Sequence, residues 1–124
     1  MTPGTTREAH DVHDCDQGDI VLVPFPFTDL SATKRRPVLV LSNGGYNRSG
    51  MDFICCGITS NLEGDARHSV PIDDSCMESG FILQPSRIKT DKIVTLERSL
   101  IVKAIGKANQ ATIEKVKREL FGLF

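Results

Sequence analysis

Short apolar runs separated by turn residues constrain this fold more than any other feature of the chain. The runs are rich in Val, Ile and Leu and are bounded by Gly, Pro, Asn and Asp, a pattern typical of β-strands. No helix-length pattern separates them before residue 109, so the sequence predicts a small β-barrel or sandwich. We expect strands at residues 20–23, 37–41, 53–59, 69–73, 80–83, 92–96 and 100–105, the fourth at a sheet edge because Pro71 interrupts it.

The C-terminal residues follow a different period. Ile113, Val116 and Leu120 recur at spacings of three and four, which places them on one face of a helix. Asn109 precedes this stripe and can cap the helix by accepting from backbone N–H groups of the first turn. We expect this helix to cover an open end or face of the barrel.

The 124 residues are enough for one domain. Residues 1–16 are polar without apolar periodicity, so we expect a disordered acidic arm before a barrel domain at residues 17–124. No apolar run approaches the roughly 20 residues of a membrane helix, and the N-terminus has no secretory pattern. The protein is therefore expected in the cytoplasm, away from the membrane, with reduced cysteines. Since Cys55 and Cys56 are adjacent on an expected strand, one should face the core and the other should not.

The charge distribution is uneven along the chain. The whole chain has a net charge of −1, which argues against a sequence-blind nucleic-acid binder. Residues 1–33 carry one basic and six acidic side chains, whereas residues 34–124 carry 14 basic and 10 acidic ones. A mildly basic body suits a polyanion, although chance surface variation explains such an imbalance equally well.

Two short segments could carry chemistry. Lys34, Arg35 and Arg36 lie where a loop meets a strand, and guanidinium groups offer forked donors that match phosphate oxygens. Pro37 biases Arg36 toward extended backbone, so Arg36 should stand at the start of the strand. A solvated basic turn is the commoner meaning of such a run. The second segment, residues 58–61, ends the third strand with hydroxyl groups that could bind phosphate, or that simply form a turn.

Other candidates are weaker. His10, His13 and Cys15 lie close together, but nothing later completes a metal-ligand spacing, so we expect no metal. His68 is a minor candidate for a general acid or base, although a lone surface histidine is commoner. No phosphate-binding glycine loop or nucleophile elbow is present, which argues against nucleotide-driven and hydrolase-triad chemistry.

These segments occur in an order that resembles the MazF/PemK family of toxins from type II toxin–antitoxin systems. The resemblance covers residues 18–124 and is strongest over residues 18–42. It is carried by Gly-Asp-Ile-Val at 18–21, Pro-Phe-Thr-Asp at 26–29, Arg-Pro-Val-Leu-Val-Leu-Ser at 36–42, Ile-Thr-Ser at 58–60, and the segments 80–83 and 87–90.

The resemblance implies an SH3-like small β-barrel of the CcdB/Kid/MazF type with a C-terminal α-helix, working as a homodimer. It implies an mRNA interferase, a metal-independent and cofactor-free endoribonuclease that cuts single-stranded RNA at specific sequences. The ribose 2′-OH would attack the adjacent phosphate to give a 2′,3′-cyclic phosphate. A cognate acidic antitoxin would cover the basic loop and groove.

The same resemblance assigns roles to residues. Arg36 would hold the scissile phosphate and is the candidate proton donor, while Thr59 would orient the phosphate or the nucleophile. The expected RNA-binding residues are Lys34, Arg35, Ser60, Asn61, Arg87 and Lys89, with Asp29 and His68 as minor candidates.

One departure keeps two alternatives open. Some family members carry an Arg-x-Asp pair where this chain has Gln84-Pro85-Ser86, so the general base has no assigned residue. The first alternative is a non-catalytic barrel toxin that binds a topoisomerase-like protein target. The second is a regulatory barrel module that binds RNA or protein without cutting.

Overall fold

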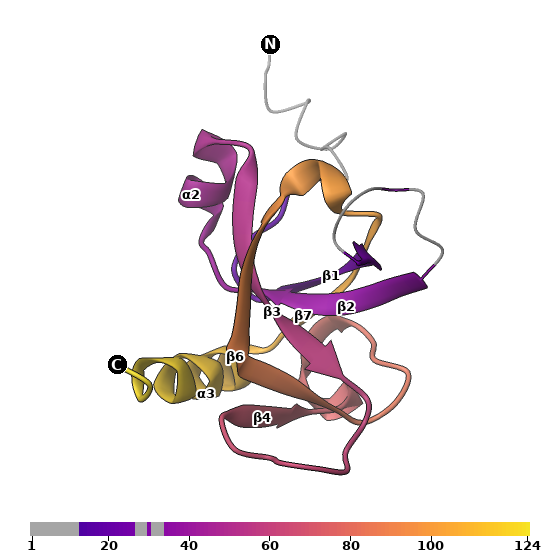
Figure 1. Ribbon diagram of the computed structural model, residues 1–124, viewed down its shortest axis with the longest axis vertical. Helices are drawn as coiled ribbons and strands as arrows, with labels where there is room; N and C mark the ends of the chain where they lie inside the picture. The colour runs from indigo at the N-terminus through magenta and orange to yellow at the C-terminus, as the bar shows by residue number, and fades with distance from the viewer. Residues whose placement is uncertain (1–12, 27–29, 31–33) are drawn as a thin grey trace.

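A single antiparallel sheet of seven strands forms the body of the protein. The computed structural model describes residues 13–26, 30 and 34–124. The sheet curls into a half-barrel, and its strand order is β4-β6-β3-β2-β1-β7-β5 (Figure 1). In chain order the elements are β1 (Asp19–Phe25), β2 (Lys34–Val40), α2 (Gly44–Ser49), β3 (Asp52–Thr59), β4 (Ser69–Ile72), the 3-10 turn η1 (Asp74–Cys76), β5 (Met77–Gly80), β6 (Ser86–Glu97), the 3-10 turn η2 (Arg98–Leu100), β7 (Lys103–Ala108) and α3 (Gln110–Phe121). The mainly β fold with a C-terminal helix is therefore confirmed.

Most expected strands are present, and the differences have physical reasons. β2 begins at Lys34 because its first residues pair with β1 as far as Phe25. β6 runs for twelve residues because its first part pairs with β4 and most of its length with β3. The expected strand at 80–83 is displaced, since β5 ends at Gly80 and the following Phe81 and Leu83 are exposed. β4 lies at the sheet edge, as Pro71 predicted.

α2 was not expected, because residues 43–45 resemble a plain turn. The Asn43 side chain caps this helix by accepting from the Tyr46 backbone N–H at 2.8 Å. Asn47 is fully buried, and its Nδ2 donates to the carbonyls of Cys15 (2.9 Å) and Ser42 (3.1 Å). Because the hydrogen bonds of this buried amide are satisfied, they fix α2 against the backbone at Cys15 and at Ser42.

Residues 13–16 differ from the expected disordered arm. Cys15 is buried in the core, and Asp16 forms an ion pair with Arg48 of α2 at 3.3 Å. Burial raises the pKa of the Cys15 thiol to about 11. Ordered packing thus begins before residue 17, because an apolar Cys15 and its backbone carbonyl both find partners in the barrel. The remainder of the expected arm, residues 1–12, lies outside the described residues.

The prediction for the cysteine pair was wrong, since both thiols are fully buried. Cys55 and Cys56 do point to opposite faces of β3, but each face packs against a separate core cluster. Cys56 lies with Ile113 and Val116 of α3, and Cys55 lies in the other cluster with residues of β1 and β2. Burial raises the pKa of each thiol to about 12, so both remain protonated near neutral pH.

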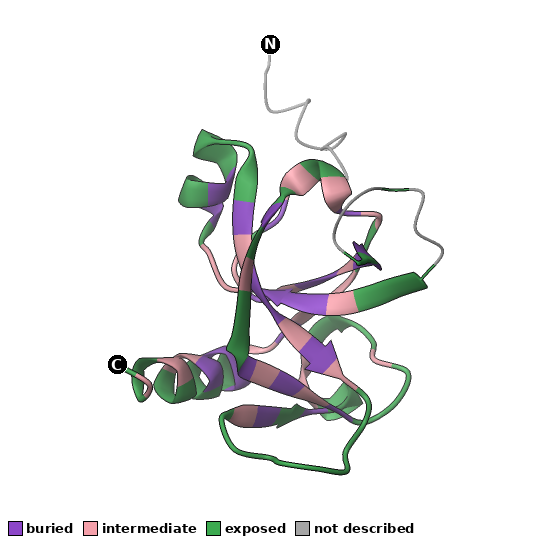
Figure 2. Cartoon of the chain, in the orientation of Figure 1, coloured by how far each residue is buried: buried purple, intermediate pink, exposed green. Residues whose placement is uncertain are grey.

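α3 covers one end of the sheet, and its inward side is buried (Figure 2). The Asn109 Oδ1 accepts from the Thr112 backbone N–H at 2.9 Å, which confirms the expected cap. Figure 2 also shows that β2 changes from exposed at its start to buried at its end. Its first residues, Lys34, Arg35 and Arg36, therefore project from the barrel as a ledge that pairs with β1.

Candidate functional site

The register of β2 and β3 relates Arg36 to Thr59. The two strands pair through Val38 with Gly57, Leu39 with Cys56 and Val40 with Cys55. Continuing this antiparallel register by two residues places Arg36 opposite Thr59. Side chains alternate along each strand, so both lie on the face that carries Val38 and Val40. Two segments separated by more than twenty residues in sequence thus contribute to one surface.

Arg36 is held at the start of β2 by β1. Its backbone pairs with Val23, and its guanidinium carbon lies 5.1 Å from the centroid of the Phe25 ring. A guanidinium over an aromatic face is attracted by the ring quadrupole and keeps its N–H donors directed outward. The arginine therefore presents fixed, exposed donors instead of sampling solvent as a flexible turn residue.

Thr59 begins a loop that its own side chain organises. Its Oγ1 accepts from the Asn61 backbone N–H at 3.1 Å, and Asn61 Oδ1 accepts from the Glu63 N–H at 3.0 Å. These are the turn contacts that the plain interpretation of residues 58–61 predicted. The Thr59 hydroxyl is an acceptor in this contact, so its own proton is available for donation to a ligand.

Arg87 and Lys89 serve the same loop. Arg87 lies directly across the ladder from Thr59, and its guanidinium donates to the carbonyls of Leu62 and, at 3.4 Å, Asp65. The Lys89 ammonium also donates to the Asp65 carbonyl at 3.4 Å. Both side chains are half-buried. The structure thus directs these two expected RNA-binding cations toward the protein's own backbone.

The remaining expected residues lie around this centre. Lys34 and Arg35 are exposed on β2 beside Arg36, and Ser60 and Asn61 follow Thr59. His68 is exposed at the other end of the loop, where its carbonyl accepts from the Thr90 N–H and hydroxyl at 3.0 and 2.7 Å. Asp29 lies outside the described residues and stays a prediction.

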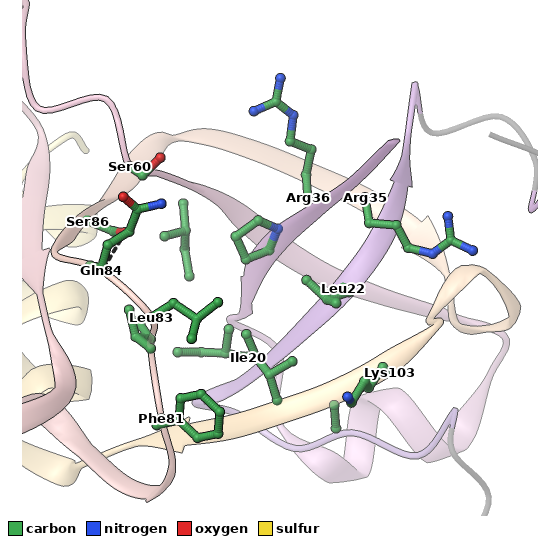
Figure 3. Close-up of a pocket in the computed structure, with 15 residues that line it drawn as sticks. Ile20, Leu22, Arg35, Arg36, Ser60, Phe81, Leu83, Gln84, Ser86 and Lys103 are labelled. Carbon is green, nitrogen blue, oxygen red and sulfur yellow. Dashed lines mark hydrogen bonds between the residues drawn. The ribbon is translucent and has the colours of Figure 1, made fainter. Parts of the chain in front are cut away.

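A hollow of about 540 Å³ opens on the other face of the same strands. Ile20, Leu22 and Ile58 contribute to its apolar floor, and Arg35, Arg36 and Lys103 lie along its rim (Figure 3). Figure 3 shows the Arg36 side chain pointing away from the floor, whereas Ser60 and Gln84 lie together at another part of the rim.

Sequence analysis missed Phe81, Gln84 and Lys103 as contributors to this hollow. They come from three separate positions along residues 80–105, and no local pattern joins them. An apolar Phe-Ile-Leu run expected to be a strand was the only available signal. In the fold, Phe81 and Leu83 of this run are 59% and 89% exposed, so the run lies at the surface beside the hollow and not in the core.

The described residues also show whether the protein could bind a metal ion or cross a membrane through a helix. Within residues 13–26, 30 and 34–124, no group of three or more His, Cys, Asp or Glu side chains is placed to bind a metal ion. His10 and Asp11 of the histidine-rich segment fall outside those residues. The described helices are all too short or too polar to cross a membrane.

Together the fold and site define a small SH3-like barrel protein with a cationic ledge suited to an anionic ligand. The model of the PemK-like, MazF-like toxin family of type II toxin–antitoxin systems matches residues 16–124, and the chain belongs to this family. No curated protein sequence matches the chain significantly.

Solved structures show the same fold. An endoribonuclease from a Mycobacterial species superposes with a TM-score of 0.68 at 20% identity, covering 88% of this chain and 89% of that one. A MazE–MazF structure from Deinococcus radiodurans gives a TM-score of 0.67 at 24% identity, with 88% and 93% covered. Toxin MazF-mt6 from Mycobacterium tuberculosis gives 0.64 at 24% identity, with 85% and 93% covered. At these identities the likeness establishes the fold.

Proposed function

We propose that this toxin is a metal-independent endoribonuclease that cuts single-stranded RNA, mRNA included, at specific sequences. The observation that supports the proposal is the β2–β3 register, which pairs Val38 with Gly57 and, continued by two residues, brings Arg36 opposite Thr59. The endoribonuclease activity named for the Mycobacterial structure supports it.

The chemistry follows from these residue types. The ribose 2′-OH attacks the adjacent phosphorus, the bond from phosphorus to the 5′-oxygen breaks, and the products are a 2′,3′-cyclic phosphate and a 5′-OH. Negative charge gathers on the phosphoryl oxygens in the transition state, where fixed donors are most effective. Arg36 supplies two forked donors to these oxygens and the proton for the leaving 5′-oxygen. Water takes up the proton that the 2′-OH releases and returns a proton to Arg36. Thr59 donates its hydroxyl proton to orient the phosphate.

The neighbouring residues divide into two groups. Lys34 and Arg35 attract the RNA backbone, while Ser60 and Asn61 contact it beside the cut. Arg87 and Lys89 act as positioning residues, because their donors hold the carbonyls of the loop that follows Thr59. Their charge still contributes to the field that attracts RNA.

We further propose that the toxin works in the cytoplasm as a homodimer and is neutralised by an acidic antitoxin. The relatives from Deinococcus radiodurans and a Mycobacterial species include complexes with MazE and with a cognate antitoxin, respectively. An acidic segment would be steered to the cationic ledge and would compete with RNA there.

Purified protein incubated with long mixed-sequence single-stranded RNA in EDTA tests the proposal. We expect a limited set of cuts that leave 2′,3′-cyclic phosphate and 5′-OH ends, and Arg36→Ala should slow them about 100-fold or more. Arg48→Ala, which changes an exposed arginine on α2, serves as the matched control. Intact RNA with the unmodified protein across varied sequences would overturn the nuclease assignment.

A non-catalytic toxin is the second candidate. It is favoured by the hollow beside Arg36, because none of its described lining residues is a carboxylate that could act as general base. This candidate predicts salt-sensitive binding of RNA, or capture of a protein target, without any cut.

A further inference from the structure

The loop between β3 and β4 is anchored on β6 at both of its ends. Thr59, the last residue of β3, pairs with Arg87, and Ser69, the first residue of β4, pairs with Lys89. Between these ends, the Arg87 and Lys89 side chains donate to loop carbonyls. The loop that begins at Thr59 therefore depends for its shape on one neighbouring strand.

Thr90 extends this arrangement by one residue beyond Lys89. It is fully buried, and its backbone N–H and its hydroxyl both donate to the His68 carbonyl, at 3.0 and 2.7 Å. A carbonyl oxygen has two lone pairs, so these two donors satisfy it. Breaking the contact would leave a buried hydroxyl without its acceptor, which is costly. We refer to Thr90 and His68 together as the latch.

The backbone of His68 takes an uncommon conformation to reach Thr90. Among the residues that the structure describes, His68 is the one residue other than glycine with a positive φ, at 56°. This left-handed region is sparsely populated by residues that carry a Cβ, and β-branched residues avoid it. The His68 side chain is exposed, so its burial does not impose the conformation. The two hydrogen bonds from Thr90 hold the His68 backbone in it.

Thr90 lies where β6 changes its register with β3. From Cys56 to Ile58 β3 advances by two residues, whereas β6 advances by five between their partners, Ile88 and Ile93. β6 therefore has three extra residues at this point, and the strand bends there (Figure 1). Thr90 is in this stretch, and its side chain is buried. The irregularity thus places a hydroxyl where the end of the loop can reach it.

We propose that the latch is a positioning device for Thr59. Thr90 fixes the end of the loop through the His68 carbonyl, and Arg87 fixes its middle. The loop in turn fixes the Asn61 N–H, which donates to the Thr59 hydroxyl oxygen at 3.1 Å, so the Thr59 hydroxyl keeps one orientation toward the phosphate. His68 acts here through its backbone carbonyl and not through its imidazole. The inference rests on the proposed RNA cleavage and adds two residues that act through Thr59.

Steady-state cleavage of a defined RNA tests the role of Thr90. Thr90→Val keeps the shape of the side chain and removes the hydroxyl, so kcat should fall about 10-fold while KM changes little. Thr90→Ser restores the hydroxyl and should recover most of the loss. Thr112→Val is the matched control and should leave kcat nearly unchanged, since Thr112 is also a buried threonine but lies on α3. An unchanged kcat in Thr90→Val, or no recovery in Thr90→Ser, would overturn the positioning role.

Two substitutions at His68 separate the role of its backbone from that of its imidazole. His68→Gly and His68→Val both remove the imidazole, but glycine adopts a positive φ readily and a β-branched valine does not. The kcat of His68→Val should therefore lie about 10-fold below that of His68→Gly. An equal loss of activity in the two variants would assign the imidazole a part in the reaction and would overturn the latch.

Amide hydrogen exchange tests the latch without any RNA. Thr90→Val should accelerate exchange in residues 60–68 about 10-fold, because one buried hydrogen bond that closes the loop is lost. His68→Val should accelerate it more than His68→Gly. Accelerated exchange together with a wild type that cuts no RNA would support the latch and refute the nuclease. Unchanged exchange in Thr90→Val, with wild-type cleavage intact, would refute the latch and leave the nuclease in place.

Discussion

Two groups of cations lie on β2 and β6, the two strands that flank β3, and they differ in what they contact. Lys34, Arg35 and Arg36 stand exposed where β2 projects from the barrel. Arg87 and Lys89 are half-buried on β6, and their donors meet carbonyls of the loop after Thr59. Charge alone does not distinguish the groups. Their places in the sheet decide which cations are exposed and which hold the loop.

The difference follows from the strand ladder. The Arg36 backbone pairs with β1, and continuing the β2–β3 register extends it past the end of the paired ladder. Arg87 lies inside a ladder, with β3 on one side and β4 on the other, and the loop that joins those two strands passes over it. A cation under a loop is within reach of backbone carbonyls, whereas the side chains at the start of the projecting strand are exposed.

The largest effect is expected from Arg36. Arg36→Ala should lower kcat about 100- to 1,000-fold, the cost of removing one transition-state donor. Arg36→Lys should recover only a small part, since an ammonium keeps the charge but cannot form the bidentate contact. Single-turnover cleavage of a defined RNA measures both variants. Full activity in Arg36→Lys would show that catalysis requires the positive charge and not the bidentate guanidinium contact.

Arg87 should separate positioning from RNA binding. Arg87→Met keeps the length of the side chain and removes the contacts to Leu62 and Asp65, so kcat should fall about 10-fold while KM changes little. Amide exchange in residues 60–67 should accelerate in the same variant.

Arg67→Met is the control for this comparison. Arg67 lies in the same loop, but its side chain is 80% exposed and forms an ion pair with the Asp65 carboxylate at 2.7 Å. It should leave kcat nearly unchanged. A raised KM with unchanged kcat in Arg87→Met would instead assign Arg87 to the RNA.

The salt dependence of RNA affinity is expected to show a smaller difference between the exposed cations of β2 and the half-buried cations of β6. Lys34→Ala should reduce the slope of log affinity against log salt by about 0.7, the value for one phosphate contact on a single strand. Lys89→Ala should change the slope much less, because its ammonium donates to a protein carbonyl. Fluorescence anisotropy with a labelled RNA across a salt series measures both. Equal slopes for the two variants would remove the distinction between the cation groups.

The smallest effect is expected for the ion pair between Arg67 and Asp65 within the loop after β3. Hydrogen bonds from Arg67 hold the pKa of the exposed Asp65 carboxyl below its ordinary value of 3.8. A depressed pKa means that this contact stabilises the loop above about pH 3.8 and is lost as the pH falls through the lower, folded value. Carboxyl NMR titration should give a midpoint below 3.8, and Arg67→Ala should move it upward. A midpoint unchanged by Arg67→Ala would contradict this pairing.

Arg36 and Thr59 were predicted as a pair by the resemblance to the MazF/PemK family, since each segment alone was equally compatible with a solvated turn. Following the same resemblance, sequence reasoning assigned Arg87 to RNA, because the loop carbonyls that Arg87 meets are visible only in the fold. It treated Cys55 and Cys56 as inside and outside because alternation tells which face a residue takes. Alternation does not tell whether the other face is also covered.

By itself, the sequence determined the strands, the C-terminal helix with its Asn109 cap, and the extended backbone at Arg36. These depend on local preferences, on periodicity and on the restriction that Pro37 imposes, all of which act within a few residues. The tertiary structure alone decided that Cys15 joins the core and that Arg87 holds the loop. It also decided that Phe81, Gln84 and Lys103 meet at one hollow. Such contacts join segments distant along the chain, so they arise only once the sheet has curled and its register is set.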